Sequence, residues 1–398
     1  MCSVIQNLEI HVNMTMYRNK MNFIFLDSTN NYPFEFSAGN SKVEYMSKAL
    51  VKLGHKVCVI NSRSGYSSEM KEGCCCGLNY VLFKKGNYFQ YIKNIYSQCK
   101  ILRKRRASNE NYVILASTFS LLLFFDIIYS KLLGYKILFL FHEMRTTVRT
   151  NKTFIKQIDS WLIDHITGYL VNGILPISHY ILDYSKVFNK PMFLLPILSD
   201  FPPQISVDSD KIDVKNSFVY CGAIAYRDII DMIIKSLSII NNDIEIKLVL
   251  YGSQNKIEQL KRNKDIKKYK VEILQSLSKE DLFSLYTNAL GLIIPLNPDN
   301  LQDKIRFSQK IAEYVSTKTP IITVNVGEIQ YYFRNQENAF IMDVFNAESL
   351  AKAMDFIVNN KELAREVGVN GYKTGEKYFS ASIVMQEFEK FILTTYSA

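Results

Sequence analysis

The chain has 398 residues, of which 48% are hydrophobic and 13% are aromatic. This composition excludes a disordered or fibrous chain, and the length predicts two domains of about 190 residues each. The formal net charge of +10 favours anionic partners. Because the sequence has no helix-turn-helix, zinc-finger or RNA-recognition signature, we expect no nucleic-acid partner. Residues 1–20 lack the apolar core of a signal peptide, so we expect no secretory signal.

The elements of the first half alternate between strands and helices. A strand at "MNFIFLD" is followed by a loop, by a helix from about Ser41 to Leu53 that ends at Gly54, and by the strand "HKVCVI". The strands "YVILAS", "YKILFLF" and "GILPIS" continue the pattern, with one helix after Phe119 and another around Trp161. Strands separated by helices of this length predict a parallel sheet with right-handed crossovers.

The seven cysteines are odd in number, and none has the paired C-x-x-C spacing of a metal site. We therefore expect reduced thiols in a cytosolic protein. Three of them are consecutive, Cys74 to Cys76, in "KEGCCCGLNY". The glycines on both sides favour a loop of small residues over a redox or metal role.

Residues 88–106 form a predicted amphipathic helix that ends in the basic run "KILRKRR". Its apolar residues recur at helical spacing. They are Phe89, Ile92, Ile95 or Tyr96, Cys99 and Leu102. Such a helix can lie on an anionic membrane surface, where each Lys or Arg contributes about 1 kcal/mol. A core-facing helix with a solvated basic end explains the pattern equally well.

The most apolar stretch is "SLLLFFDIIYSKLLGYKILFLF", residues 120–141, and three charges and a glycine interrupt it. A charge near the centre of a bilayer would cost about 2.5–3.5 kcal/mol on the insertion scale. We therefore expect a buried helix to about Leu133 and a buried strand from Tyr135, rather than a membrane span.

The alternation restarts after a Pro-rich, acidic linker near residues 199–216. Strands are predicted at "SFVYCG", "IKLVLYG", "YKVEIL", "ALGLIIPL" and "PIITVNV", separated by helices that include a Lys-rich one around "KRNKDIKKYK". Two further helices, "AESLAKAMDFIVNN" and "ASIVMQEFEKFILTTY", close the chain. Ligands of such sheets bind outside the carboxyl ends of the strands.

The stretch "RFSQKIAEYVSTKTPIITVNVGE", residues 306–328, combines a basic loop, a helix start and an apolar strand. A helix N-terminus favours a phosphate group, and Lys310 in the first turn can bring an ammonium to the same anion. Glu313, on the same face, is an acceptor suited to the vicinal diol of a ribose. The spacing alone fits an exposed i,i+3 ion pair equally well.

The stretch from "SQKIAEYVSTKTPII" to "AESLAKAMDFIVNN" resembles the donor-nucleotide region of retaining GT-B glycosyltransferases of group 1, the GT4-type family, with its pattern S-K-x-x-E-Y-x-x-x-G-x-P-I-I. Three earlier stretches of the chain, "KALVKLGHKVCVI", "LFLFHE" and "FVYCGAIAYRDIIDMIIKSL", also resemble segments of the family and lie in the family's order. The likeness covers most of residues 21–390 and is strongest in the C-terminal half. It implies an α/β fold of two doubly wound, parallel-sheet, Rossmann-like domains that face a cleft.

The resemblance also implies domain limits. We expect an N-terminal extension over residues 1–19, an acceptor-side domain over 20–200 and a nucleotide-sugar-binding domain over 201–375. Residues 376–398 would form a C-terminal helix that packs back on the first domain.

Nine residues acquire a role from the resemblance. Arg227 and Lys310 would neutralise the diphosphate as the sugar leaves, and His142 would reach the transferring sugar. The nucleotide-sugar-binding residues would be Gly39, Gly222, Ser276, Leu277, Ser308 and Glu313. The ribose would contact Glu313, and the base would meet the backbone around Ser276. Because no Asp-x-Asp motif stands in a suitable place, we expect a metal-independent enzyme without a cofactor.

The sequence departs from the family pattern at Ile305, where the family has the first carboxylate of an acidic pair, eight residues before the second. Asp299 or Asp303 could take its place, or backbone amides could read the sugar hydroxyls. If His142 were a general base, the reaction could be inverting rather than retaining.

These features predict a hexosyltransferase-type enzyme that moves a sugar from a UDP- or GDP-sugar to a glycan or lipid-linked acceptor. Its role would lie in cell-surface polysaccharide or glycoconjugate biosynthesis. We expect it in the cytoplasm, with a peripheral contact to the inner face of the membrane through residues 88–106. The alternatives are a non-catalytic nucleotide- or glycan-binding subunit and a nucleotide-sugar 2-epimerase.

Overall fold

The computed structural model describes residues 20–26, 38–61, 69–75, 77–107, 110–116, 120–148, 153–201 and 216–396. The predicted extension over residues 1–19, Cys76 and most of the predicted linker lie outside these ranges. Contacts divide the chain into two compact units, and each is described by itself. Unit 1 comprises Met1–Leu140, Ile158–Ile174 and Phe188–Pro191, and unit 2 comprises Phe141–Gln157, Leu175–Val187 and Met192–Ala398. The predicted domain limits, and the packing of the last helix on the first domain, stay predictions.

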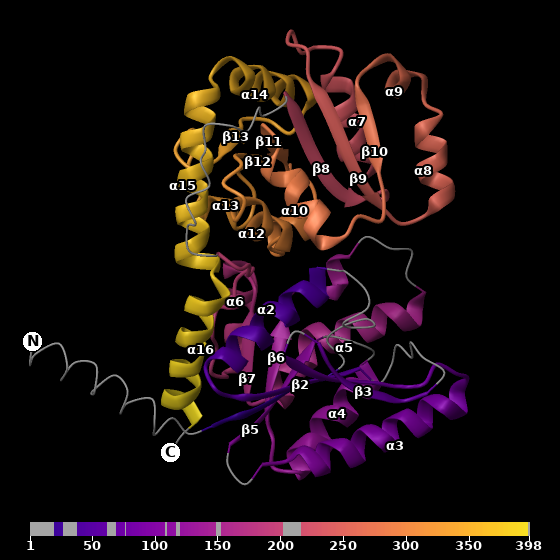
Figure 1. Ribbon diagram of the computed structural model, residues 1–398. Helices are drawn as coiled ribbons and strands as arrows, with labels where there is room; N and C mark the ends of the chain where they lie inside the picture. The colour runs from indigo at the N-terminus through magenta and orange to yellow at the C-terminus, as the bar shows by residue number, and fades with distance from the viewer. Residues whose placement is uncertain are drawn as a thin grey trace, which may run out of the picture. The chain divides into compact units, whose positions relative to one another are not determined.

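The first sheet has seven strands in the order β3-β4-β2-β1-β5-β6-β7 (Figure 1). They are β1 (Asn22–Leu26), β2 (Lys56–Asn61), β3 (Lys71–Cys75), β4 (Leu78–Leu82), β5 (Asn111–Ala116), β6 (Lys136–Phe141) and β7 (Gly173–Pro176). Central β1 is fully buried and runs parallel to both neighbours, with Phe23 opposite Val57 on β2 and Tyr112 on β5. Strands buried on both faces read as apolar runs, which explains the predicted segments.

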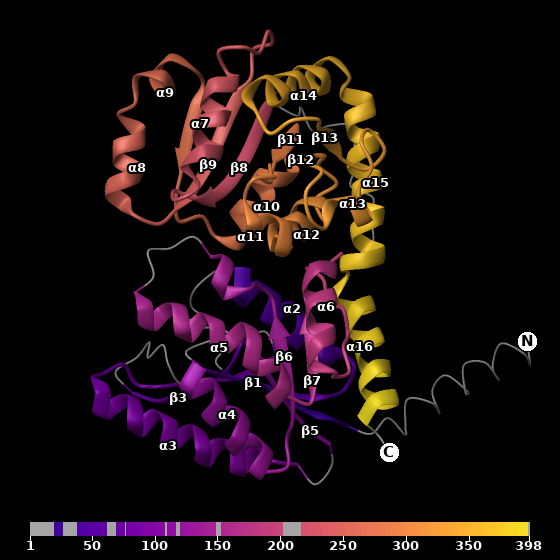
Figure 2. The same cartoon turned by 180° about the vertical axis from the view of Figure 1, so that it is seen from behind.

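Helices connect these strands. They are α2 (Ala38–Lys52), α3 (Tyr88–Arg105), α4 (Ser120–Leu132) and α5 (Phe154–Leu170). A further helix, α6 (His179–Ser185), follows β7 and belongs to unit 2, and short 3-10 turns lie at Arg145–Thr147 and Lys186–Phe188. The connections through α3, α4 and α5 all step across the sheet in one direction, and the connection through α2 steps in the other. Right-handed crossovers therefore place α3, α4 and α5 on one face of the sheet and α2 on the opposite face (Figure 2).

The second sheet has six strands in the order β10-β9-β8-β11-β12-β13, and all neighbours are parallel. The strands are β8 (Ser217–Ala223), β9 (Glu245–Tyr251), β10 (Val271–Leu274), β11 (Gly291–Ile293), β12 (Ile321–Val324) and β13 (Phe340–Met342). The strand order reverses between β8 and β11, and such a switch point opens a crevice outside the carboxyl ends of the strands.

Ten helices accompany the second sheet within the described residues, from α7 to α16. They are α7 (Arg227–Ser236), α8 (Gln254–Lys261), α9 (Lys264–Lys268), α10 (Lys279–Thr287), α11 (Leu301–Ile305), α12 (Gln309–Val315), α13 (Ile329–Tyr332), α14 (Ala347–Asn359), α15 (Lys361–Phe379) and α16 (Ala381–Tyr396). The predicted alternation is confirmed in both halves. The single Lys-rich helix is wrong, because α8 and α9 are separate short helices.

Two further expectations are corrected. The loop predicted around the consecutive cysteines is a hairpin: Cys74 and Cys75 lie in β3, antiparallel to β4, and Gly77 adopts the left-handed φ of 79° that the turn requires. The helix after Phe119 ends at Leu132 as expected, but it is buried on one side only, since Leu121 and Leu132 are 67% and 80% exposed.

The described residues contain no group of three or more His, Cys, Asp or Glu side chains that could hold a metal ion. Cys58, Cys74, Cys99 and Cys221 are free cysteines. Across the same ranges, every helix is too short or too polar to cross a bilayer.

Candidate functional site

The candidate site lies at the carboxyl edge of the second sheet, within unit 2. Gly222 stands near the end of β8, and Tyr251 is the last residue of β9. The loops after β11 and β12 lead into α11 and α13, and α12 begins just after α11. The most specific sequence predictions, Gly222, Lys310 and Glu313, belong to elements that meet here.

Gly222 is buried in β8, and a neighbouring side chain explains why the position is glycine. The phenol of Tyr220, two residues earlier and on the same face, folds over it. A Cβ atom at position 222 would lie 2.2 Å from the Tyr220 hydroxyl oxygen. Real contacts of this kind do not fall below about 3 Å, so any side chain would have to displace a buried tyrosine. The predicted approach of a diphosphate to this backbone stays a prediction.

A cluster of tyrosine hydroxyls surrounds Cys221, the residue between Tyr220 and Gly222 in the chain. The Cys221 amide donates to the Tyr314 hydroxyl at 3.1 Å, and its thiol hydrogen-bonds the Tyr251 hydroxyl. The rings of Tyr286 and Tyr314 meet edge to face, 4.7 Å apart. Burial raises the pKa of the Cys221 thiol and of these phenols, so all of them stay protonated at neutral pH. The cluster forms the neutral floor of the site and aligns α12 on β8.

Lys310 and Glu313 lie on α12, above this floor. Glu313 is only 3% exposed, so the exposed ion pair that spacing alone allowed is wrong. The Lys310 ammonium lies 5.8 Å from the centre of the Tyr251 ring. Burial lowers the pKa of Lys310, whereas Glu313 raises it and Arg306 lowers it further. Lys310 is therefore a desolvated cation with a second cation close enough to repel it.

Arg306 is that second cation, and the sequence analysis assigned it no role. Its guanidinium donates to the Tyr226 hydroxyl at 2.9 Å and to Asp303 Oδ1 at 2.8 Å. Burial opposes its charge, but Tyr226 and Asp303 raise the pKa of Arg306. Its Nε is buried and has no hydrogen-bond acceptor among the described residues. One donor of a fixed guanidinium fork thus remains available to a ligand.

No role could be assigned to Arg306 from the sequence, because its surroundings are formed by residues that only the tertiary structure brings together. The only signal in the sequence is a basic residue two positions before Ser308, the residue that precedes α12. Its partner Asp303 also accepts from the Asn297 amide at 3.1 Å, in the loop after β11. A chain of contacts therefore runs from this loop through Asp303 to Arg306. It also shows that Asp303, one of the two carboxylates considered for the place of Ile305, is already engaged.

Three other predicted residues lie at the same edge. Ser276 and Leu277 are in the loop from β10 to α10, where Ser276 is exposed and adopts a left-handed φ of 55°. That conformation is unusual for a residue other than glycine and marks the loop as constrained. Ser308 is the N-cap residue of α12, but its side chain makes no capping hydrogen bond. The nucleotide contacts of these residues stay predictions.

The remaining predicted residues are placed differently. Arg227 begins α7 on the surface, and its Nε lies 2.9 Å from Asp231 Oδ1 in an exposed i,i+4 ion pair. Gly39 is exposed in the first turn of α2 in unit 1, and half-buried His142 follows the last residue of β6. The structure thus groups Gly222, Lys310 and Glu313 with Arg306, and gives Arg227 a surface partner of its own.

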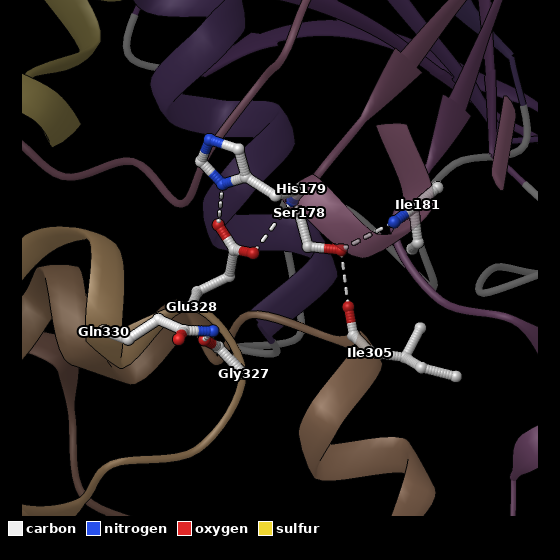
Figure 3. A network of polar contacts seen from close by, with 7 residues as sticks. All are labelled: Ser178, His179, Ile181, Ile305, Gly327, Glu328 and Gln330. Atoms are coloured by element: carbon white, nitrogen blue, oxygen red, sulfur yellow. Dashed lines mark hydrogen bonds and ion pairs between the residues drawn. The ribbon is translucent and has the colours of Figure 1, made fainter. Parts of the chain in front are cut away.

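A second polar network borders α11 (Figure 3). Glu328 is buried, and its carboxylate accepts from the His179 amide at 2.8 Å and contacts His179 Nδ1 at 2.9 Å. The His179 ring stacks on Tyr331 with 3.8 Å between ring centres. Burial raises the pKa of Glu328, and the contacts with His179 oppose that shift.

This network is attached to the backbone that precedes Arg306. The Ser178 hydroxyl donates to the Ile305 carbonyl at 2.5 Å and accepts from the Ile181 amide, capping α6 (Figure 3). Gly327, with a φ of 58°, lies so close that a Cβ would be 2.9 Å from the carbonyls of Asp303 and Lys304. The loop after β12 and the start of α6 therefore hold the end of α11, and with it the position of Arg306.

Comparison with known proteins finds a family match over part of the chain. Residues 203–374 match the sequence model of the family described as Glycosyl transferases group 1. Over 198 residues the chain is 25% identical to the capsular polysaccharide biosynthesis glycosyltransferase CapM of Staphylococcus aureus. The matched region covers 47% of this chain and 50% of CapM. The chain thus spans about half the length of this curated relative.

Solved structures match over nearly the whole chain. Sucrose-phosphate synthase from Thermosynechococcus elongatus has a TM-score of 0.69 and 14% identity, over 94% of this chain and 99% of that one. HepE from Anabaena, in complex with UDP-glucose, has a TM-score of 0.70 and 11% identity, over 94% and 99%. A glycosyltransferase from Rickettsia africae has a TM-score of 0.68 and 17% identity, over 96% and 100%. At these identities the likeness shows the fold, and the expected GT-B class with two parallel-sheet α/β domains is confirmed.

Proposed function

We propose that this chain, whose residues 203–374 match the model of the glycosyl transferases of group 1, moves a sugar from a nucleotide-diphosphate sugar to a glycan or lipid-linked acceptor. The product would be a cell-surface polysaccharide or glycoconjugate. This assignment is supported by the relationship to CapM over half of its length and by the site at the carboxyl edge of the second sheet.

The observation that carries the proposal is the pair of cations at that edge. Arg306 lowers the pKa of Lys310, so the two charges repel each other in a partly desolvated place. Such an arrangement is stabilised when an anion binds between the charges, and the buried Nε of Arg306 still has a hydrogen bond to donate. A diphosphate is an anion of suitable charge, and its negative charge grows as the sugar departs.

The roles proposed for the residues combine the family resemblance with this pair of cations. Lys310 and Arg306 would stabilise the leaving diphosphate, with Arg227 as a third cation at the surface. Glu313 would accept hydrogen bonds from the ribose, and the base would lie against the loop of Ser276 and Leu277. Because these cations can do the work that a metal does elsewhere, we propose a metal-independent reaction. We also propose that it retains configuration, with the acceptor attacking the face that the diphosphate leaves.

The donor is proposed to be a UDP-sugar first and a GDP-sugar second. HepE of Anabaena, a structural neighbour, was solved with UDP and with UDP-glucose. His142 and Gly39 would contact the transferring sugar and the acceptor. For the acceptor we propose a lipid-linked glycan at the inner face of the membrane, approached from the cytoplasm, with residues 88–106 in contact with anionic lipid.

The test is nucleotide release. The purified chain is incubated with UDP- and GDP-sugars in the presence of a chelator, and free nucleoside diphosphate, free sugar and sugar isomers are measured with and without a glycan acceptor. Acceptor-dependent release of UDP or GDP is the expected result. An epimerised sugar nucleotide without release identifies a 2-epimerase, and binding without turnover of any donor identifies a non-catalytic subunit. Activity that appears only when Mg²⁺ or Mn²⁺ is added would refute the metal-independent mechanism.

A further inference from the structure

The face of the first sheet that α3, α4 and α5 cover continues into an outer surface of unusual composition. Two buried carboxylates hold this helix layer together. Gln98 on α3 donates to Asp126 on α4 at 2.9 Å, and the Ser120 amide that begins α4 donates to Asp159 on α5 at 2.6 Å. The three helices are therefore neighbours in one layer, with one side on the sheet and the other side turned away from it (Figure 2).

That outer side exposes many large apolar side chains. They are Phe89, Ile92 and Tyr96 on α3; Leu121, Phe125, Ile128 and Leu132 on α4; and Ile158, Trp161 and Tyr169 on α5. On α4 they recur at spacings of four, three and four residues, which is one stripe along a helix. The fraction of each side chain that is exposed ranges from 41% for Phe125 to 80% for Leu132. Apolar surface gathered in this way marks an interaction site rather than ordinary surface.

The exposed charged side chains of the same helix layer are all basic. Its three acidic residues, Asp126, Asp159 and Asp164, are all buried. The exposed charges are basic, namely Lys93, Lys100, Arg103, Lys104 and Lys131. Arg105 is half-buried and paired with Glu72 at 3.0 Å. Within α3, α4 and residues 158–170 of α5, the outer surface is thus apolar and cationic, without an exposed carboxylate.

We propose that the outer surface of α3, α4 and residues 158–170 of α5 docks on an anionic lipid bilayer, with the α4 stripe and Trp161 inserted among the lipids. Aromatic and aliphatic side chains with Lys and Arg beside them match the interfacial region of a membrane, where rings lie at the headgroup level and cations meet lipid phosphates. The Lys100 ammonium, 4.6 Å from the centre of the Tyr96 ring, shows how both kinds of group share one helix face.

This inference extends the contact proposed for residues 88–106 from one basic helix to a layer in which α4 supplies the apolar insertion. It stands on the surface itself and is tested by lipid binding alone, so it holds or fails independently of sugar transfer. A protein partner is less well matched, because protein interfaces are ordinarily depleted of lysine, whereas this surface exposes four lysines.

Trp161 supplies the first test, because it is the only tryptophan of the chain and is 49% exposed on α5. The full chain is mixed with vesicles of phosphatidylcholine alone or of phosphatidylcholine with phosphatidylglycerol. We expect the fluorescence of Trp161 to shift to the blue and to be quenched by brominated acyl chains only when the anionic lipid is present. Binding to anionic vesicles with neither a blue shift nor quenching would overturn the insertion of this layer.

Two sets of variants provide the second test, measured by vesicle co-sedimentation. Leu121→Ser, Phe125→Ser and Ile128→Ser together should lower vesicle affinity at least about 10-fold. Lys100→Gln, Arg103→Gln and Lys104→Gln together should lower it about 150-fold at low salt, at about 1 kcal/mol for each charge. The residues are exposed, so the variants should fold, and circular dichroism checks this.

Two matched control variants remove the same kinds of side chain from the surface of unit 2. Ile239→Ser, Leu301→Ser and Val344→Ser remove three exposed apolar side chains of unit 2, and Lys264→Gln, Lys267→Gln and Lys268→Gln remove three exposed charges from α9. Both controls should bind vesicles as the parent chain does. The proposal is overturned if the parent chain ignores anionic vesicles, if the α4 variant binds like the parent, or if that variant loses only self-association in solution.

Discussion

Replacing Lys310 by methionine separates binding from folding, because the buried ammonium destabilises the folded state but favours the binding of a diphosphate. Burial lowers the pKa of Lys310 below its ordinary value of 10.5, even though Glu313 favours the charge. The folded state therefore disfavours the protonated lysine at neutral pH. Methionine keeps most of the side-chain volume without the charge, so we expect Lys310→Met to increase the free energy of unfolding.

The sign of the pH dependence follows from the same shift. Between the lowered pKa and 10.5 the unfolded chain binds more protons than the folded one at this residue, so the parent chain gains stability as the pH rises. The advantage of Lys310→Met should thus be full below the lowered pKa and disappear as the pH approaches 10.5. Urea unfolding at several pH values measures it, with Lys352→Met, an exposed lysine of α14, as the matched control.

Binding should change in the opposite direction. A charge-assisted hydrogen bond to phosphate is worth about 1.5–3 kcal/mol, so Lys310→Met should raise the Kd for UDP about 10- to 150-fold. Binding should not vanish, because Arg306 still supplies one cation. Calorimetric titration with UDP and a chelator gives the Kd of both variants. A variant that is more stable and binds UDP as tightly as the parent would refute the assignment of Lys310 to the donor site.

Arg306→Gln should lower the free energy of unfolding by about 1–3 kcal/mol in urea, since it leaves buried Asp303 without its guanidinium, and should also weaken UDP binding. Gly222→Ala should cost about 1–3 kcal/mol because its Cβ meets the Tyr220 phenol, and most of this cost should disappear in a Tyr220→Ala background; an equal cost in both would contradict the packing argument. Burial raises the pKa of Glu328 above 4.5, so its contribution to stability is full below 4.5 and is lost as the pH rises. Glu328→Gln should therefore become more stable relative to the parent as the pH rises from 4.5, and a constant difference would show that the shift is absent.

The sequence determined the alternation of strands and helices because burial on both faces of a parallel strand leaves an apolar run that is visible without any tertiary information. It also determined that Lys310 and Glu313 share one face of α12, because they are three residues apart. The hairpin of Cys74 and Cys75 was not visible, because glycines beside small residues fit a loop as well as an edge strand with a tight turn.

The tertiary structure alone decided which side chains are exposed and which are paired. The apolar run of α4 reads as a core helix, and only the layer it forms with α3 and α5 leaves Leu121 and Leu132 on the outside. Arg306 and Asp303 are ordinary charges in the sequence, and they acquire their roles because the end of α11 and the start of α7 bring both of them together with Tyr226. Local spacing specifies the face of a helix on which a residue lies, but the surroundings of that face come from segments far away in the chain.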